Sequence, residues 1–207
     1  MPLYPRLPDN TADDAYAALD AFYRGQIEPL GSAKLVFMGD AENNVANSLM
    51  VVCAKLGLHF VACGPRERMP KADLVATCRE LARESGGSVT LTSSVEEACT
   101  GADVVYTDIW VSMGEPAELW EERIKLLSPY QVNSRVIDLM APTGIFMHCL
   151  PAFHDTETTI GAEIAERFDI TEMEVTDEVF RGSRSRVFDE AENRMHSIKA
   201  IIYATLK

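Results

Sequence analysis

Features typical of secreted, membrane-spanning and metal-binding proteins are missing from this sequence. Its 207 residues contain no stretch of about 18 apolar residues, which a membrane-spanning helix needs, and residues 1–6 lack the apolar core of a signal peptide. The five cysteines are odd in number, scattered and never spaced as CxxC, so neither a disulfide framework nor a zinc site is expected. These absences predict a soluble protein of the reducing cytoplasm.

Positive charge is also scarce. The sequence has 19 lysine and arginine residues against 32 aspartate and glutamate residues, a formal net charge of −13. A nucleic acid or an anionic membrane surface would repel such a chain, so neither is expected as a partner. The hydrophobic and charged fractions, 47% and 25%, are those of an ordinary globular protein.

Short apolar runs alternate along the chain with segments of helical periodicity. Strands are expected at 34–38, 59–63, 89–91 and 103–107, with later candidates at 135–139 and 144–149, and helices at 43–56, 71–86, 95–99 and 189–206. This alternation predicts an α/β fold with a doubly wound, mainly parallel sheet and helices on both faces, in a Rossmann-like arrangement. We expect one α/β domain at 34–207, preceded by an N-terminal arm and helix at 1–33.

Ligands of open α/β sheets bind beyond the carboxyl ends of the strands, which directs attention to the loops that follow them. The loop from Gly39 to Asn44 has a single glycine and does not match the GxGxxG fingerprint, so NAD and FAD are not expected. Asn43 and Asn44 open the next helix, where side-chain amides and free N–H groups favour a small zwitterion with a carboxylate. A simple helix-capping role is an equally good interpretation of either asparagine.

Two further loops carry reactive side chains. Asp108 follows a buried strand, where its carboxylate could pair with a substrate ammonium group, although an acidic residue there is more often a helix cap or a solvated turn. Cys149 neighbours His148, but adjacent strand residues point to opposite faces, so a Cys–His dyad is not expected and a buried structural cysteine is the usual alternative. For Arg194, the alternative to a site role is an exposed ion pair with Glu190 four residues earlier.

Four segments in order carry a family resemblance. They are Asp-Ala-Glu-Asn-Asn-Val-Ala-Asn-Ser-Leu (40–49), Asp-Ile-Trp-Val-Ser-Met-Gly (108–114), His-Cys-Leu-Pro (148–151) and Glu-Ala-Glu-Asn-Arg (190–194). Together they resemble the second half of ornithine carbamoyltransferases, from about residue 34 to residue 207. In that family two α/β domains face each other, and the first holds carbamoyl phosphate while the second holds ornithine.

The resemblance implies a role for each matched residue. The amino-acid end of ornithine would be contacted by Asn44, Asp108, Ser112 and Met113. The side-chain nitrogen of ornithine would lie beside Cys149, and the carbamoyl group would face Cys149, Leu150 and Arg194. A cis peptide bond between Leu150 and Pro151 is also implied.

The family reaction joins the neutral δ-nitrogen of ornithine to the carbamoyl carbon and yields citrulline and phosphate, a step of arginine metabolism. An alkyl amine with a pKa near about 10 is mostly protonated at neutral pH, so Cys149 and Asp108 are the expected groups for removing the proton. Arg194 would polarise the carbamoyl oxygen as negative charge develops on it. No cofactor or metal is expected.

The family's phosphate-binding motifs, Ser-x-Arg-Thr-Arg and His-Pro-x-Gln, do not occur in these 207 residues. The late arginines Arg181, Arg184 and Arg186 could bind phosphate, but a solvated basic loop is the more common arrangement. We therefore expect the ornithine-binding half of a carbamoyltransferase, inactive unless another chain supplies the carbamoyl phosphate site.

The alternatives are a non-catalytic module for amino-acid binding or assembly, and a fragment that binds nothing. The sequence leaves homo-oligomerisation and the anabolic or catabolic direction open.

Overall fold

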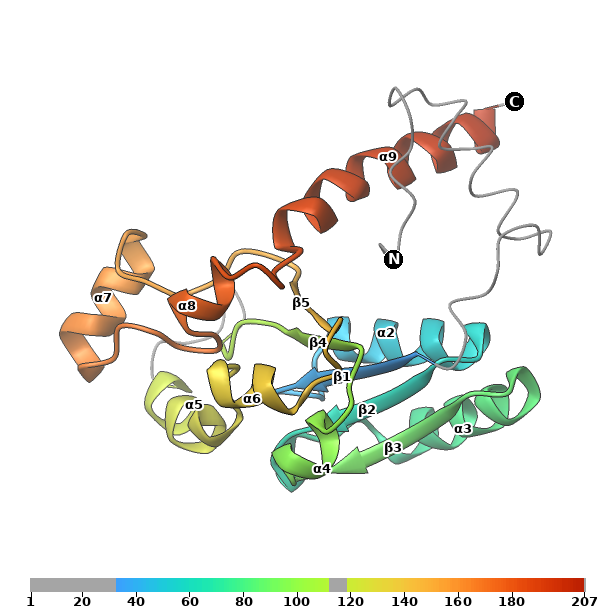
Figure 1. The fold of residues 1–207 in the computed structure, drawn as a ribbon, viewed down its shortest axis with the longest axis horizontal. Helices are drawn as coiled ribbons and strands as arrows, with labels where there is room; N and C mark the ends of the chain where they lie inside the picture. Colours follow the sequence, from blue (N-terminus) through green and yellow to red (C-terminus); the bar gives the residue numbers. More distant parts are fainter. Residues whose placement is uncertain (1–32, 112–118, 207) are drawn as a thin grey trace. The chain divides into compact units, whose positions relative to one another are not determined.

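A five-stranded parallel sheet organises the fold of the computed structural model, which describes residues 33–111 and 119–206 (Figure 1). The strands are β1 (Lys34–Met38), β2 (His59–Cys63), β3 (Ser88–Thr92), β4 (Val104–Thr107) and β5 (Ile145–His148). Their order in the sheet is β3-β2-β1-β4-β5, and every neighbouring pair is parallel. The predicted α/β fold with a Rossmann-like parallel sheet is therefore confirmed.

Helices make up most of the remaining regular structure in the described ranges. They are α2 (Asn44–Leu56), α3 (Ala72–Ser85), α4 (Val95–Cys99), α5 (Leu119–Leu127), α6 (Ser134–Leu139), α7 (Thr159–Phe168), α8 (Asp177–Phe180) and α9 (Val187–Leu206), with short 3₁₀ turns η2 (Arg66–Arg68) and η3 (Ser128–Tyr130). Helices α2 and α3 lie together on one face, and α4 and α6 pack on the other (Figure 1). Parallel strands joined by helical crossovers need this cover on both faces.

The local sequence accounts for the ends of α2. Asn43 has extended backbone angles, and its side-chain oxygen accepts from the N–H of Ala46, so it is the N-cap. Gly57 ends the helix in the left-handed region at φ 77°, where its N–H donates to the carbonyl of Cys53. The observed helix, Asn44–Leu56, agrees closely with the predicted range of 43–56.

One of the late strand candidates is wrong. Residues 135–139 belong to helix α6, because Asn133 caps a short helical turn by accepting from the N–H of Val136. An apolar run of five residues fits a short helix as well as a strand, and the capping asparagine decides between them. The other candidate, 144–149, contains β5.

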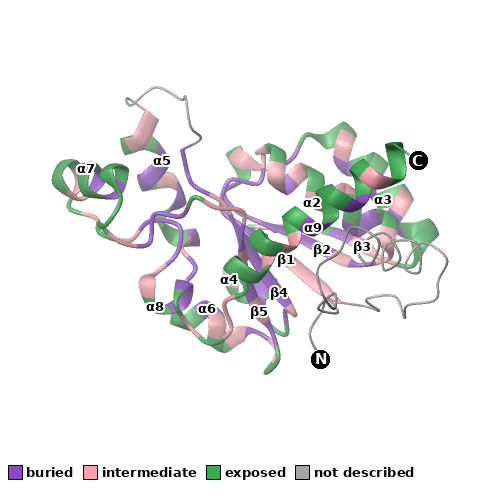
Figure 2. Cartoon of the chain, turned by 90° about the horizontal axis from the view of Figure 1, so that it is seen from above, coloured by how far each residue is buried: buried purple, intermediate pink, exposed green. Residues whose placement is uncertain are grey.

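The core on the α4 and α6 side consists of alternate strand residues packed against those helices. It includes Val36, Met38, Val105 and Phe146 from the strands and Val136 from α6, all buried. Figure 2 shows the inner strands of the sheet mostly buried, the edge strand β3 only partly buried, and the outer surfaces of the helices exposed. The alternation along each strand places neighbouring residues on opposite faces of the sheet, which sets the directions of the side chains at the strand ends.

The chain divides into two compact units, which are described separately. The sheet unit ends at Val187, and the other unit includes α9 from Phe188 onward. The predicted helix near the N-terminus lies outside the described residues, so the proposed boundaries at 1–33 and 34–207 stay predictions. No helix in the described ranges is long and apolar enough to cross a membrane.

Candidate functional site

The register of the sheet brings three sequence-distant loops to one edge. Phe37 of β1 pairs with Tyr106 of β4, and Thr107 at the end of β4 pairs with His148 at the end of β5. The Thr107 hydroxyl also donates to the carbonyl of Met38 at 2.7 Å, which ties the ends of β1 and β4 together. The loops that follow β1, β4 and β5 therefore begin side by side.

Asp108 is at the centre of this edge. Its Oδ1 accepts from its neighbour's backbone, the N–H of Ile109, at 2.8 Å and from Sγ of Cys149 at 3.1 Å. Its Oδ2 accepts from Nδ2 of Asn43 at 3.1 Å. A carboxylate offers about four acceptor positions, and these contacts from the described residues use three. The half-buried carboxylate is thus held in one orientation and retains acceptor capacity on Oδ2.

Buried residues next to Asp108 fix its position. Ile109 and Trp110 are almost fully buried in a second apolar cluster that also contains Leu127 and Phe153. Their burial anchors the chain directly after β4, so the carboxylate is presented by a rigid segment.

The two candidate asparagines have different positions. Asn43 caps α2 with its oxygen and binds Asp108 with its amide nitrogen, so one side chain makes both the capping contact and the site contact. Asn44 is the first residue of α2, and its side chain is exposed. The sequence left a ligand-binding or a capping role open for either asparagine, and the family resemblance selected Asn44 for the ligand, so the contact between Asn43 and Asp108 is new information from the structure.

Cys149 differs from the other cysteines of the chain. All five are free thiols, but Cys149 is only partly buried whereas Cys53, Cys63, Cys78 and Cys99 are buried. Burial raises the pKa of Cys53 and of Cys63 to about 12, so these thiols stay protonated at neutral pH. The usual alternative of a buried structural cysteine therefore describes these residues and does not describe Cys149.

His148 points away from Cys149, as the strand geometry predicts. Its Nδ1 accepts from the N–H of Leu150 at 2.9 Å, so the ring proton belongs on Nε2, which faces Oε1 of Glu174 at 3.3 Å. The same Oε1 accepts from the N–H of Phe153 at 2.6 Å. The fully buried pair of His148 and Glu174 thus holds the backbone on both sides of Pro151.

The bond between Leu150 and Pro151 is cis, and Leu150 has φ 55°. The cis bond implied by the family resemblance is therefore present. Glu174 was missed at the level of sequence, because polar and apolar residues are mixed from residue 171 to residue 177 and nothing there marks this glutamate as buried.

Three predicted site residues stay predictions. Ser112 and Met113 lie outside the described residues. Arg194 belongs to α9, which lies in the other unit, so its approach to the site stays a prediction.

The late arginines are engaged with the protein itself. Arg184 donates to the carbonyls of Ile137 and Ala141, which precede β5 at the opposite edge of the sheet from Asp108. Arg186 donates to the carbonyls of Ser183 and Ser185. The described contacts therefore give these two side chains structural roles within their own region.

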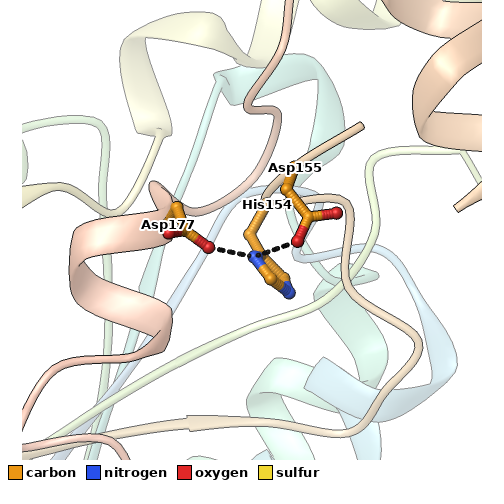
Figure 3. Close-up of side chains that lie close together, drawn as sticks. All are labelled: His154, Asp155 and Asp177. Atoms are coloured by element: carbon orange, nitrogen blue, oxygen red, sulfur yellow. Dashed lines mark hydrogen bonds and ion pairs between the residues drawn. The ribbon is translucent and has the colours of Figure 1, made fainter. Parts of the chain in front are cut away.

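Arg181 belongs to a cluster of charged side chains after the cis proline, which we call the His154 cluster. Figure 3 shows its other three members. The cluster consists of His154, Asp155, Asp177 and Arg181. Nδ1 of His154 lies 2.8 Å from Asp177 and 3.4 Å from Asp155, and Arg181 binds both carboxylates at 2.7 and 3.0 Å. The histidine and the two aspartates could offer three metal ligands, but the guanidinium of Arg181 already binds both carboxylates. The arrangement is that of an ion-pair network.

Comparison with known proteins identifies the family to which this chain belongs. Residues 32–205 match the family model for the Asp/Orn-binding domain of aspartate/ornithine carbamoyltransferases. The chain therefore belongs to the aspartate/ornithine carbamoyltransferase family.

Individual relatives narrow the similarity to the ornithine enzymes. The catabolic ornithine carbamoyltransferase of Treponema denticola is 59% identical over 177 residues, covering 86% of this chain and 52% of that protein. The ornithine carbamoyltransferase structure from Pyrococcus furiosus has a TM-score of 0.71 at 37% identity, covering 92% of this chain and 54% of that one. The enzyme from Giardia lamblia has a TM-score of 0.68 at 31% identity, with 91% and 54% covered. The chain spans about half the length of these relatives.

Proposed function

We propose that this chain forms the ornithine-binding half of an ornithine carbamoyltransferase site. The observation that carries the proposal is the contact set around Asp108, whose carboxylate is oriented by Asn43 and Cys149 at the carboxyl edge of the sheet. A fixed carboxylate with acceptor capacity on Oδ2 suits the α-ammonium group of an amino acid. The similarity to ornithine carbamoyltransferases selects ornithine as that amino acid.

The proposed chemistry needs ornithine with a neutral δ-amine. The nitrogen forms a bond to the carbamoyl carbon, the bond from that carbon to the phosphate oxygen breaks, and the nitrogen releases a proton. The contact between the Cys149 thiol and Asp108 offers a route for that proton, because the two groups already share a hydrogen bond. Arg194 would stabilise the negative charge on the carbamoyl oxygen.

Carbamoyl phosphate would be held by groups outside these 207 residues. Binding a phosphate dianion needs several cationic or N–H donors, and the sequence contains neither of the family's phosphate-binding motifs. Arg184 and Arg186 bind backbone carbonyls instead. We further propose a cytoplasmic location, which suits the free thiols and the acidic charge.

The ornithine site is tested by calorimetric titration of the chain with L-ornithine and with L-norvaline, which lacks the δ-amine. Asp108→Asn should weaken both ligands by roughly 1–3 kcal/mol, because both share the α-ammonium group that loses its charged partner. Asp103→Asn is the matched control, since Asp103 accepts from the backbone of Lys34 at the opposite edge of the sheet. Equal affinities in the wild type and Asp108→Asn would remove Asp108 from the site.

A citrulline assay tests whether the chain needs a carbamoyl phosphate site from another polypeptide. The chain alone, supplied with ornithine and carbamoyl phosphate, should form no citrulline. Turnover by the isolated chain would contradict the proposed absence of a carbamoyl phosphate site. Ornithine binding without activity, even when a carbamoyl-phosphate-binding polypeptide is added, would favour the alternative of a non-catalytic amino-acid-binding module.

A further inference from the structure

A second group of charged side chains lies behind Asn43, and we call it the Asp40 cluster. It consists of Asp40, Glu42, Arg68 and Arg123. Arg68 binds both carboxylate oxygens of Asp40, with Nε at 3.0 Å from Oδ1 and Nη2 at 2.7 Å from Oδ2. Arg123 adds a contact from Nη1 to Oδ2 at 2.7 Å. The cluster joins the loop after β1 to turn η2 and to helix α5.

Asp40 also shapes the loop that carries Asn43. Its Oδ1 accepts from the N–H of Glu42 at 3.1 Å, and its backbone carbonyl accepts from the N–H of Asn43 at 3.4 Å. These two contacts fold residues 40–43 into a tight turn of the kind that aspartate side chains favour. Gly39 permits the turn, because its φ of 123° is a conformation that side-chain-bearing residues rarely adopt.

A continuous set of contacts therefore leads from the arginines to the candidate site. The arginines hold the Asp40 carboxylate, and Asp40 holds the turn. The turn places Asn43, whose Nδ2 binds Oδ2 of Asp108. We propose that Asp40, fixed by Arg68 and Arg123, is a positioning residue that keeps Asn43 and hence Asp108 oriented for the amino-acid ligand. The part of this inference that concerns the ligand rests on the proposed function.

The charge balance of the cluster supports this role. Arg68 also binds Glu42 at 2.6 Å, so two guanidinium groups face two carboxylates. The side chains of Asp40 and Arg123 are 8% and 11% exposed, so water screens them little. The charges of these four described side chains balance, so the cluster fixes the turn without adding a net charge of its own near Asp108, whose charge remains available to an ammonium group.

The test uses Asp40→Asn, which retains an oxygen for the N–H of Glu42 but removes the charge that the arginines hold. NMR of the ligand-free chain should show the Asn43 side-chain amide signals shifted and exchanging faster with water. The dissociation constant for L-ornithine should rise about tenfold. Arg83→Gln is the control, because Arg83 forms an exposed pair with Glu80 within α3, and it should change neither readout.

A conservative substitution at Arg123 distinguishes a positioning role of the cluster from a general effect on stability. Arg123→Lys keeps a cation for Asp40 and should retain affinity within about threefold, whereas Arg123→Met should lose about tenfold. If either Asp40→Asn or Arg123→Met fails to fold, Arg68→Gln, at a less buried position, provides the same readouts. Unmoved Asn43 amide signals in the folded variants would overturn the positioning role, whether or not ornithine binds. Shifted signals in a chain whose wild type shows no ornithine binding would retain the positioning role and reject the proposed function.

Discussion

The Asp40 cluster and the His154 cluster contain similar groups in different environments. Each has two carboxylates, and each has two basic side chains, which are two arginines in the Asp40 cluster and an arginine and a histidine in the His154 cluster. In the Asp40 cluster the side chains of Asp40, Arg123 and Arg68 are 8%, 11% and 24% exposed, and that of Glu42 is 37% exposed. In the His154 cluster His154 and Asp155 are 11% and 20% exposed, but Asp177 and Arg181 are 42% and 56% exposed. The distances overlap, since contacts of 2.7 Å occur in both. Contact geometry alone therefore does not tell the two clusters apart.

Burial determines what each cluster contributes. A buried charge that loses its partner cannot recover its hydration, so breaking a buried pair is costly. An exposed pair exchanges one set of favourable contacts for another with water, and its net contribution is small. The Asp40 cluster should therefore fix structure near the site, while the His154 cluster should adjust the loop after the cis proline only slightly.

The largest expected effect is on stability after removal of Asp40. Asp40→Ala removes the buried carboxylate that Arg68 and Arg123 share, and we expect the free energy of unfolding to fall by about 3–5 kcal/mol. Asp177→Ala, the matched change at a side chain of the His154 cluster that is 42% exposed, should cost much less, because water can solvate the groups that it leaves. Urea denaturation measures both. Similar losses in the two variants would show that burial does not distinguish the clusters.

A smaller effect should appear in the response to salt. Arg68→Gln and Arg181→Gln each remove one guanidinium group, and the denaturation midpoints of both can be compared with the wild type in 0.05 and 1 M NaCl. The screening length falls to about 3 Å at 1 M salt, but screening acts mainly on exposed charges. The denaturation midpoint of the wild type should therefore exceed that of Arg181→Gln only at low salt. It should exceed that of Arg68→Gln at both salt concentrations. Loss of both differences at high salt would indicate that water reaches the Asp40 cluster.

The smallest effect concerns acid stability. Hydrogen bonds from Arg181 and then from His154 hold the pKa of Asp177 below its usual value. A lowered folded-state pKa gives stability that is present above the unfolded pKa of about 3.9 and is lost as the pH falls through the folded value. Thermal melts of the wild type and Asp177→Asn from pH 2 to pH 7 should thus converge only below about pH 4. A difference in melting temperature between the wild type and Asp177→Asn that does not change with pH would contradict this linkage.

The strands and their parallel arrangement were predictable because each apolar run is short and lies between helical segments. The error at residues 135–139 shows the limit of that signal, since a short apolar run carries no periodicity and only the cap at Asn133 identifies the helix. Helices α5 and α7 were not predicted. For α7, Thr158 is a usable cap signal, because its side chain accepts from the N–H of Gly161.

The candidate site was predictable only in part. Asp108 and Cys149 were selected from their motifs, and the structure brings them into contact. The choice between Asn43 and Asn44 depends on which residue occupies the cap, a difference of one position that helix prediction does not resolve. Arg68 and Arg123 lie 28 and 83 residues from Asp40 in sequence. Their meeting depends on sheet order and helix placement, so no local pattern reveals it.

The sheet has a practical consequence for binding measurements. The loops that carry Asn43, Asp108 and Cys149 all leave from the carboxyl edge, whereas the exposed turn at Thr100 and Gly101 precedes β4 at the opposite edge. A sensor surface coupled through position 100 would therefore attach to the end of the sheet that is remote from these loops. Immobilised in that orientation, the chain would present its ligand-facing rim to the flowing solution.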